Sequence, residues 1–156
     1  MRLPELLSAQ DLVLPLSAGD KWDAITRLVD HTVEQGNVRS ELRDEVLELV
    51  LARERSMSTG MEKGIAIPHA AVDGLDRIVG SFGVVTAEEG LAFEAIDARP
   101  TYLVVLLLIP RAQKLQHIRT LNSIAQILRS DATRTALRDA SDVDAAWAIL
   151  DGADQG

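Results

Sequence analysis

The stretch RERSMSTGMEKGIAIPHA, residues 53–70, joins a short apolar run to a proline and a histidine in an order that packing alone does not require. Ile65–Ile67 are apolar, short and partly β-branched, which predicts a buried strand. Pro68 is expected to end this strand, because it has no N–H and favours an extended residue before it. His69 is therefore predicted to lie at the end of a strand, on a stiff backbone.

The loop before this strand carries groups that bind oxyanions. Ser58 and Thr59 offer hydroxyl and N–H donors, and Gly60 and Gly64 bracket a segment that can take a positive φ or approach a ligand closely. Arg53 precedes the loop and could reach phosphoryl oxygens. Such donors beside a rigid imidazole are what reversible attack of a histidine on a phosphoryl group requires. The same residues also fit a structural interpretation, as a turn, a buried histidine and a cation favoured by a helix end.

Three motifs of this stretch occur together in one protein family. They are Arg53-Glu54, Ser58-Thr59-Gly60 and the run from Gly64 to His69, Gly-Ile-Ala-Ile-Pro-His. This arrangement resembles the active-site segment of the EIIA proteins of the bacterial phosphoenolpyruvate-dependent phosphotransferase system (PTS), in their fructose/mannitol/nitrogen-regulatory branch (EIIA type 2). The resemblance continues through Ala92–Asp97 to His117 and covers nearly the whole chain.

Two positions depart from the family pattern. Ala70 follows the histidine where many members have glycine, and Met61-Glu62-Lys63 stands where the segment between the glycines is often small and polar. Neither change removes a reacting group, but we expect both to bear on the shape of the loop and on partner preference.

The resemblance implies a role for each site residue. His69 is expected to be the phosphorylated nucleophile, attacking through Nε2 while a backbone carbonyl holds its other ring nitrogen. His117 and Arg53 are expected to stabilise the phosphoryl oxygens, and Ser58, Thr59, Gly60 and Gly64 to form a phosphate-binding loop. No metal and no cofactor are expected.

Other chemistries fit the residues less well. Two histidines with Asp73 as a third ligand would be a possible metal site, but no motif positions that aspartate. The sequence has no Gly-x-Ser-x-Gly nucleophile elbow and no P-loop. The phosphoryl group is therefore expected to arrive already activated on another protein.

Composition limits the partners. The chain has 156 residues, a net charge of −8 and no cysteine, so nucleic acid, anionic membranes, disulfides and a thiolate nucleophile of its own are not expected. The first residues, Met1–Glu5, do not have the apolar core expected of a signal peptide, and the longest apolar run, Tyr102–Ile109, is shorter than the ~20 residues of a membrane helix. We expect a cytoplasmic protein without direct membrane insertion.

Hydrophobic periodicity predicts a single α/β (α+β) domain over residues 1–156, with a frayed tail at 151–156. It should be a three-layer domain, with a mixed sheet of four to five strands and helices on both faces, because Tyr102–Ile109 is apolar throughout. Strands are expected at Leu12–Leu16, Ile65–Ile67, Arg77–Thr86, Leu91–Ala95 and Tyr102–Ile109. Helices are expected at Lys21–Gln35 with Asp20 as the cap, at Ser40–Arg53 with Ser40 as the cap, and at Gln113–Arg129, Ala132–Asp139 and Asp142–Leu150. Their spacing places Trp22, Leu115 and Ile118 among the inner apolar positions.

Two functions remain open at this point. In the first, the protein is a phosphocarrier of the nitrogen-regulatory type, which takes a phosphoryl group from a histidine carrier protein (HPr type) and acts on a regulatory target. In the alternative, it is a fructose/mannitol-type EIIA component that passes the phosphoryl group to a cysteine of an EIIB domain during sugar uptake. An isolated EIIA domain favours the first.

Overall fold

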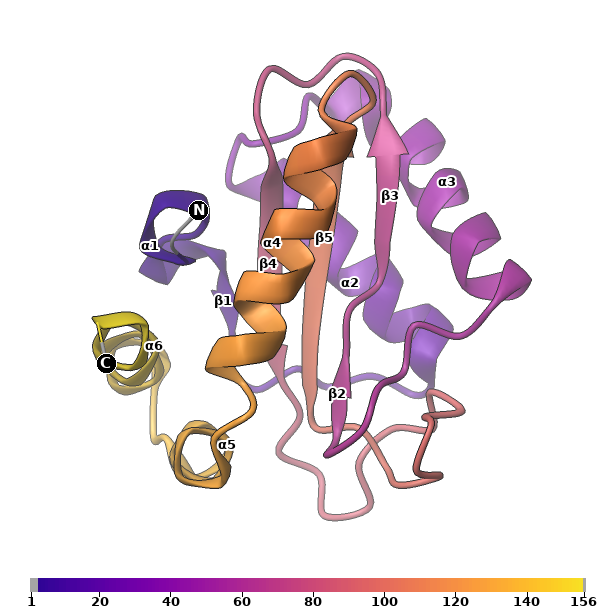
Figure 1. Cartoon of the computed structure of the whole chain (residues 1–156). Coiled ribbons are helices and arrows are strands. Elements are labelled where there is room, and N and C mark those ends of the chain that lie inside the picture. The colour runs from indigo at the N-terminus through magenta and orange to yellow at the C-terminus, as the bar shows by residue number, and fades with distance from the viewer. Residues whose placement is uncertain (1–2, 156) are drawn as a thin grey trace.

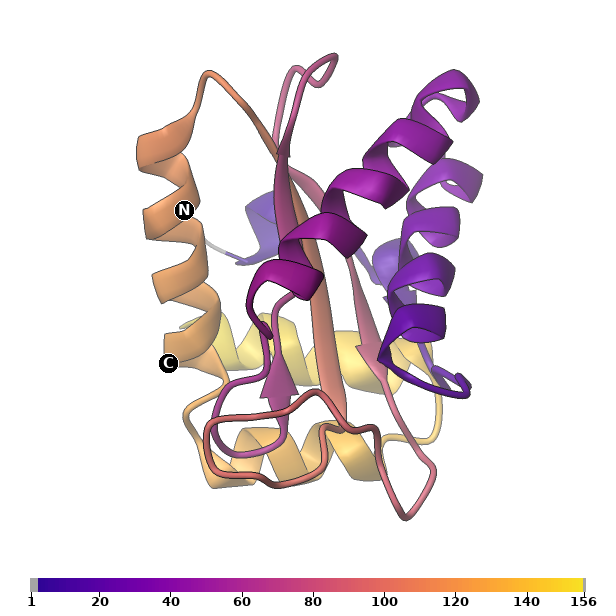
Figure 2. The same ribbon diagram turned by 90° about the vertical axis from the view of Figure 1, so that its right-hand side faces the viewer.

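A computed structural model describes residues 3–155, and at residues 3, 4, 114, 116, 117, 154 and 155 it describes the backbone only. A central sheet lies between two layers of helices (Figure 1, Figure 2), which confirms the predicted three-layer architecture. One layer contains α2 (Lys21–Glu34) and α3 (Arg43–Ser56). The other contains α1 (Leu3–Leu6), α4 (Lys114–Ile127), α5 (Asp131–Asp139) and α6 (Val143–Gln155).

The described part of the chain forms one mixed sheet of five strands. They are β1 (Leu12–Val13), β2 (Ile65–Ala66), β3 (His69–Val72), β4 (Val79–Val84) and β5 (Leu103–Pro110). Their order is β1-β4-β5, with β2 and β3 both on the far side of β5. β4 runs antiparallel to β5, and the other pairs are parallel.

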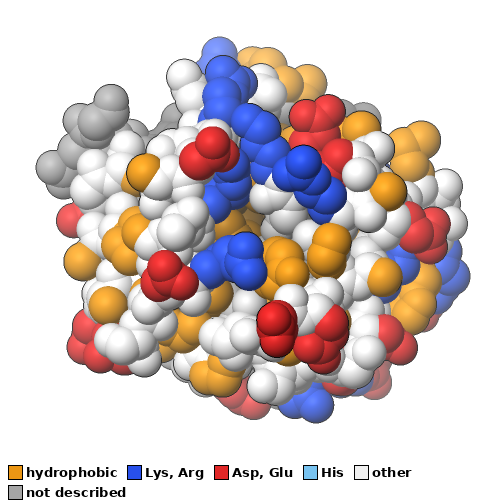
Figure 3. All heavy atoms as spheres, turned by 90° about the horizontal axis from the view of Figure 1, so that it is seen from below, with side chains coloured by type: hydrophobic (Ala, Val, Ile, Leu, Met, Phe, Trp, Pro, Cys, Tyr) orange, Lys and Arg blue, Asp and Glu red, His pale blue; other side chains and the backbone are white. Residues whose placement is uncertain are grey.

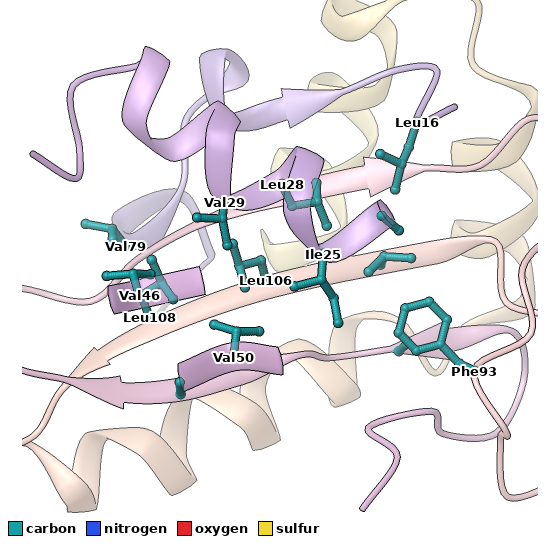
Figure 4. Close-up of a cluster of buried hydrophobic side chains, with 14 of the residues drawn as sticks. Leu16, Ile25, Leu28, Val29, Val46, Val50, Val79, Phe93, Leu106 and Leu108 are labelled. Atoms are coloured by element: carbon teal, nitrogen blue, oxygen red, sulfur yellow. The ribbon is translucent and has the colours of Figure 1, made fainter. Parts of the chain in front are cut away.

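β5 is buried on both faces, as its apolar sequence predicted. Leu103, Val105, Leu107 and Ile109 pack into the cluster that includes Ile124 and Leu128 of α4. Val104, Leu106 and Leu108 pack into the cluster formed with α2 and α3 (Figure 4). Because side chains alternate along a strand, β5 joins the two halves of an aliphatic core.

The edge beside β5 differs from the prediction. Pro68 was expected to end the strand Ile65–Ile67 and to leave His69 at its end, but His69 is instead the first residue of a second strand, β3. β2 and β3 pair in turn with the same long strand, at Ile65↔Leu103 and at His69↔Leu107. The proline interrupts the edge without ending it, because β5 is long enough to pair on both sides of the break.

Two helix starts were predicted, and one is confirmed. The Asp20 side chain accepts a hydrogen bond from Asp23 N at 2.8 Å and caps α2. Ser40, which was expected to cap the next helix, instead begins a short 3₁₀ turn, Ser40–Leu42, and α3 starts only at Arg43. The expected strand over Leu91–Ala95 is reduced to a single bridge between Leu91 and Thr101.

Three apolar residues expected on inner helix faces lie at the surface. Leu115 and Ile118 of α4 are 64% and 60% exposed, and Trp22 of α2 is 37% exposed. At the C-terminus, α6 continues to Gln155, past the expected end at Leu150, so a helix replaces the expected frayed tail as far as the structure describes it. Among the described helices, none has both the length and the apolar character needed to cross a membrane.

Candidate active site

His69 lies at the break between β2 and β3, and its ring is fixed by the backbone just before it. Nδ1 lies 2.8 Å from the carbonyl oxygen of Ile67, two residues earlier. A carbonyl oxygen can only accept, so Nδ1 carries the proton and the lone pair of the neutral imidazole is on Nε2. The predicted backbone carbonyl partner is confirmed, and it selects the tautomer that Nε2 chemistry needs.

The direction of the His69 side chain follows from its strand. Ala70 and Val72 pack into the cluster with α2 and α3. Side chains alternate along a strand, so half-buried His69 faces the other side of the sheet, the side that α4 covers. His117 belongs to the first turn of α4, but its side chain is outside the described residues. Its role as a phosphoryl stabiliser therefore stays a prediction.

The Ser58–Thr59 loop is held by a buried carboxylate on α3. Glu54 is 2% exposed, and its Oε2 accepts hydrogen bonds from Thr59 N at 3.0 Å and Thr59 Oγ1 at 2.6 Å. The hydroxyl of Ser58 contacts Glu54 Oε1 at 3.2 Å and the carbonyl oxygen of Phe93. Each hydroxyl has one proton, and these contacts use both. In this conformation the two hydroxyls fix the loop, and their role toward a phosphoryl group stays a prediction.

Lys21 compensates the buried charge of Glu54. Its Nζ lies 3.3 Å from Glu54 Oε1 and 3.5 Å from Glu94 Oε1. Lys21 was not among the predicted site residues, although its position in the sequence carries a signal. It precedes Ile25 by four residues and Leu28 by seven, so it lies on the buried face of α2. A cation at such a position needs a buried partner.

The loop is also joined to the histidine through Ile67. Ile67 N donates to Thr59 O at 3.2 Å, and Gly60 forms an antiparallel bridge with Ala66. Gly60 cannot carry a side chain here, because an added Cβ would lie 2.7 Å from the carbonyl oxygen of Phe93. This segment of the predicted phosphate-binding loop thus positions the strand that presents His69.

Gly64, the last residue of the predicted phosphate-binding loop, lies at a turn. It turns the chain into β2 with a φ of 78°. Its carbonyl oxygen accepts from the N–H groups of Tyr102 and Leu103, at 2.9 and 3.0 Å. It lines a separate cavity at the start of β2 and β5. Gly64 therefore shapes the turn into β2, and its part in phosphate binding stays a prediction.

Arg53 lies in the last turn of α3, as predicted. Its Nη1 donates to the carbonyl oxygen of Met57 at 2.7 Å and so satisfies a free carbonyl at the helix end. This contact matches the structural alternative considered for Arg53. Its function toward a phosphoryl group stays a prediction.

The segment after Phe93 is folded around Asp97. The carboxylate accepts from Lys63 N at 2.9 Å and Arg99 N at 3.1 Å. The pKa of Asp97 is held below its usual range, chiefly by the hydrogen bond from the Lys63 N–H and next by the one from the Arg99 N–H. Asp97 thereby links the loop before β2 to the loop before β5.

Comparison with known proteins identifies the family. The chain belongs to the family "Phosphoenolpyruvate-dependent sugar phosphotransferase system, EIIA 2", whose profile matches residues 5–153. This confirms the resemblance drawn from the Gly64–His69 motif. Membership implies a function in phosphoryl transfer in general.

Individual relatives carry both regulatory and sugar-transport names. A nitrogen regulatory protein of Bradyrhizobium diazoefficiens is 29% identical over 96% of this chain and 95% of its own length. A PTS fructose-specific EIIA component of Haloferax volcanii is 33% identical over 77% of this chain and 75% of its own length. The crystal structure of the nitrogen regulatory protein IIA-Ntr from Neisseria meningitidis superposes with a TM-score of 0.83, at 27% identity, over 95% of this chain and 98% of that one.

Proposed function

We propose that this protein is a phosphocarrier, which accepts a phosphoryl group on Nε2 of His69 from a histidine-phosphorylated carrier protein of the HPr type. The observation that carries the proposal is the 2.8 Å contact between His69 Nδ1 and the carbonyl oxygen of Ile67. This contact aims the ring and leaves the lone pair on the opposite nitrogen. The proposed outcome is a regulatory signal, as in the nitrogen-regulatory members of the family.

The transfer step replaces one high-energy N–P bond with another. The Nε2 lone pair attacks phosphorus in line, a new N–P bond forms, and the N–P bond of the donor histidine breaks. The donor nitrogen keeps the bonding electron pair, and the proton on His69 Nδ1 stays in place. The phosphorylated ring carries more positive charge than the neutral one, so the Ile67 carbonyl stabilises the product more than the starting state. One imidazole replaces another, which makes the two sides of the step similar in energy.

Residues around the ring have supporting roles in this proposal. Two residues stabilise the equatorial oxygens of the phosphoryl group: His117, on the side of the sheet that His69 faces, and Arg53, whose long side chain extends from the end of α3. To do so, Arg53 exchanges its hydrogen bond with Met57 for one with phosphate. Glu54 holds the Ser58–Thr59 loop and so keeps Ile67 in position.

Partner docking is supported by the surface of α4. Leu115 and Ile118, in the same part of α4 as His117, are largely exposed. Exposed apolar residues beside a reactive group favour contact with another protein. The curated relatives that match this chain over nearly their whole length include nitrogen regulatory proteins, which favours a regulatory target.

A second candidate function rests on the transport relatives. One structural neighbour, the mannitol enzyme IIA of Escherichia coli, was solved in complex with phosphorylated enzyme IIB; its fold matches with a TM-score of 0.78 at 23% identity. Together with the fructose-specific relative, this favours a cysteine of an EIIB domain as the alternative acceptor.

A transfer assay tests the proposal. The protein is incubated with a phosphorylated HPr-type donor, and incorporated phosphate is measured before and after acid treatment. We expect one phosphoryl group that is labile in acid and stable in base, no incorporation in His69→Ala, and normal incorporation in the control His31→Ala. An acid-stable product would contradict the proposal. Addition of an EIIB domain then separates the two acceptors, because rapid loss of phosphate to it favours the transport alternative.

A further inference from the structure

A cavity of about 310 Å³ opens at the end of the molecule that Figure 3 faces, where β2 and β5 begin. Lysine and arginine side chains gather around this hollow in Figure 3. The lining residues include four cations, Lys63, Arg99, Arg134 and Arg138, and one carboxylate, Asp131. The whole chain carries a net charge of −8, so the lining of this cavity has the opposite charge to the protein as a whole.

The four cations are not equally available. Arg134 donates to the carbonyl oxygens of Leu128 and Arg129, both at 2.7 Å, and pairs with Asp131, so its role is to hold the start of α5. Arg99 lies 3.8 Å from Asp97 but keeps 73% of its side chain exposed. Among the side chains that the structure describes, Lys63 and Arg138 pair with no carboxylate. Three cationic groups are therefore left for a ligand.

Arg138 is held in place by an aromatic ring. Its guanidinium lies 3.6 Å from the centre of the Tyr102 ring, and the Tyr102 hydroxyl donates to the carbonyl oxygen of Glu88 at 2.7 Å. Gly90 packs so closely that an added Cβ would lie 3.0 Å from a ring carbon of Tyr102. A guanidinium stacked on an anchored ring still offers the N–H groups at its edge to an anion. Because the stack already restricts the side chain, little conformational entropy is lost when a ligand binds.

We propose that this cavity binds a small organic anion with a carboxylate or phosphate group and a compact, partly apolar body. Lys63, Arg99 and Arg138 would contact the anionic group, and Tyr102 with Leu103 the apolar part. The small volume of the cavity and the overall negative charge of the chain favour a small ligand over nucleic acid. The site is distinct from His69. His69 is not among the residues that line the cavity, and it pairs with Leu107, four residues further along β5 than Leu103 on the cavity wall.

Binding can be tested on the intact protein by NMR titration and calorimetry with succinate, citrate and glycerol 3-phosphate, and with inorganic phosphate alone. We expect saturable shifts of the Lys63, Tyr102 and Arg138 signals. Stronger binding of the first two probes would identify a carboxylate ligand, and stronger binding of glycerol 3-phosphate a phosphate ester. Arg138→Gln should weaken binding by about tenfold or more, as expected for loss of one charge-assisted contact.

Two controls make the result decisive. Arg27→Gln removes one positive charge from α2, in the other helix layer, and should leave the affinity unchanged. If Arg138→Gln alters the fold, as seen by its thermal unfolding, Lys63→Gln is used in its place. No saturable binding of any probe up to about 10 mM, binding of inorganic phosphate as tight as that of the organic anions, or equal affinity in the cavity variants and Arg27→Gln would overturn the proposal.

Discussion

Ile67 connects His69 to Thr59 through its own peptide groups: its carbonyl oxygen lies 2.8 Å from His69 Nδ1, and its N–H donates to Thr59 O at 3.2 Å. Thr59 is in turn bonded through its N–H and its hydroxyl to the buried carboxylate of Glu54. The orientation of the proposed nucleophile therefore depends on a chain of contacts that begins on α3. Each step of that chain can be tested separately.

Replacing Glu54 with Gln should destabilise the fold and loosen the loop. The change leaves Lys21, which is 6% exposed, without its buried counter-charge and weakens the hydrogen bonds from Thr59. Breaking a buried pair from one side costs about 3 kcal/mol of unfolding free energy. Urea unfolding measures this loss. The matched control is Glu48→Gln on the same helix, whose exposed pair with Arg55 should contribute about 0–1 kcal/mol. Equal losses in the two variants would contradict the role of Glu54.

Gly60→Ala should destabilise the protein through a clash with the backbone. The new Cβ would lie 2.7 Å from Phe93 O and 3.0 Å from Ala95 Cα, so one segment must move. Overpacking of this kind costs about 1–3 kcal/mol, measured by thermal unfolding. Gly19→Ala is the control, because nothing lies within 4 Å of its added Cβ. A Gly60→Ala protein as stable as the control would show that the Phe93 segment can yield.

Asp97→Asn should reduce stability at neutral pH and have less effect in acid. The pKa of Asp97 is lowered in the folded state, chiefly by the N–H of Lys63, so its carboxylate favours folding above the unfolded pKa near 3.8. That contribution is lost as the pH falls through the lower, folded pKa. The gap between the urea midpoints of the wild type and the variant should therefore shrink below about pH 4. A gap that stays constant between neutral and acid pH would contradict this assignment.

His117→Ala should still accept a phosphoryl group, but transfer it onward more slowly. Loss of one hydrogen-bond donor to the transferring group reduces rates by roughly 10²–10³ in comparable sites. Single-turnover phosphorylation and dephosphorylation, followed by rapid quench, separate the two steps. Gln126→Ala, at an exposed position later in α4, serves as the control. A His117→Ala protein that accepts no phosphate at all would reverse the roles assigned to the two histidines.

The layers of the fold could be predicted from the sequence because β5 is apolar at every position and α2 has a regular buried stripe. Periodicity could not reveal that Leu115 and Ile118 are exposed, because it reports an apolar face and not what covers that face. Pro68 was predicted to end a strand. The structure instead has strands on both sides of it, because both pair with β5, whose length the local sequence around Pro68 does not reveal.

In the candidate site, too, local features could be predicted and long-range contacts could not. His69 could be singled out because the run from Gly64 to His69 is continuous in sequence, and its carbonyl partner, Ile67, lies only two residues earlier. The contacts of Glu54 with Lys21 and of Ser58 with Phe93 join residues 33 and 35 positions apart, and no local pattern specifies them. The hydroxyls of the loop were therefore assigned to phosphate, although the folded chain uses them internally.

The central claim is that Nε2 of His69 carries the phosphoryl group, while Nδ1 keeps its hydrogen bond to Ile67. The most direct measurement is ¹⁵N–³¹P NMR of the protein labelled in its histidine rings and phosphorylated by an HPr-type donor. We expect one-bond coupling between phosphorus and Nε2 of His69, with the Nδ1 proton still present. Coupling to Nδ1 of His69, coupling to another histidine, or a phosphate ester without coupling to nitrogen would contradict it.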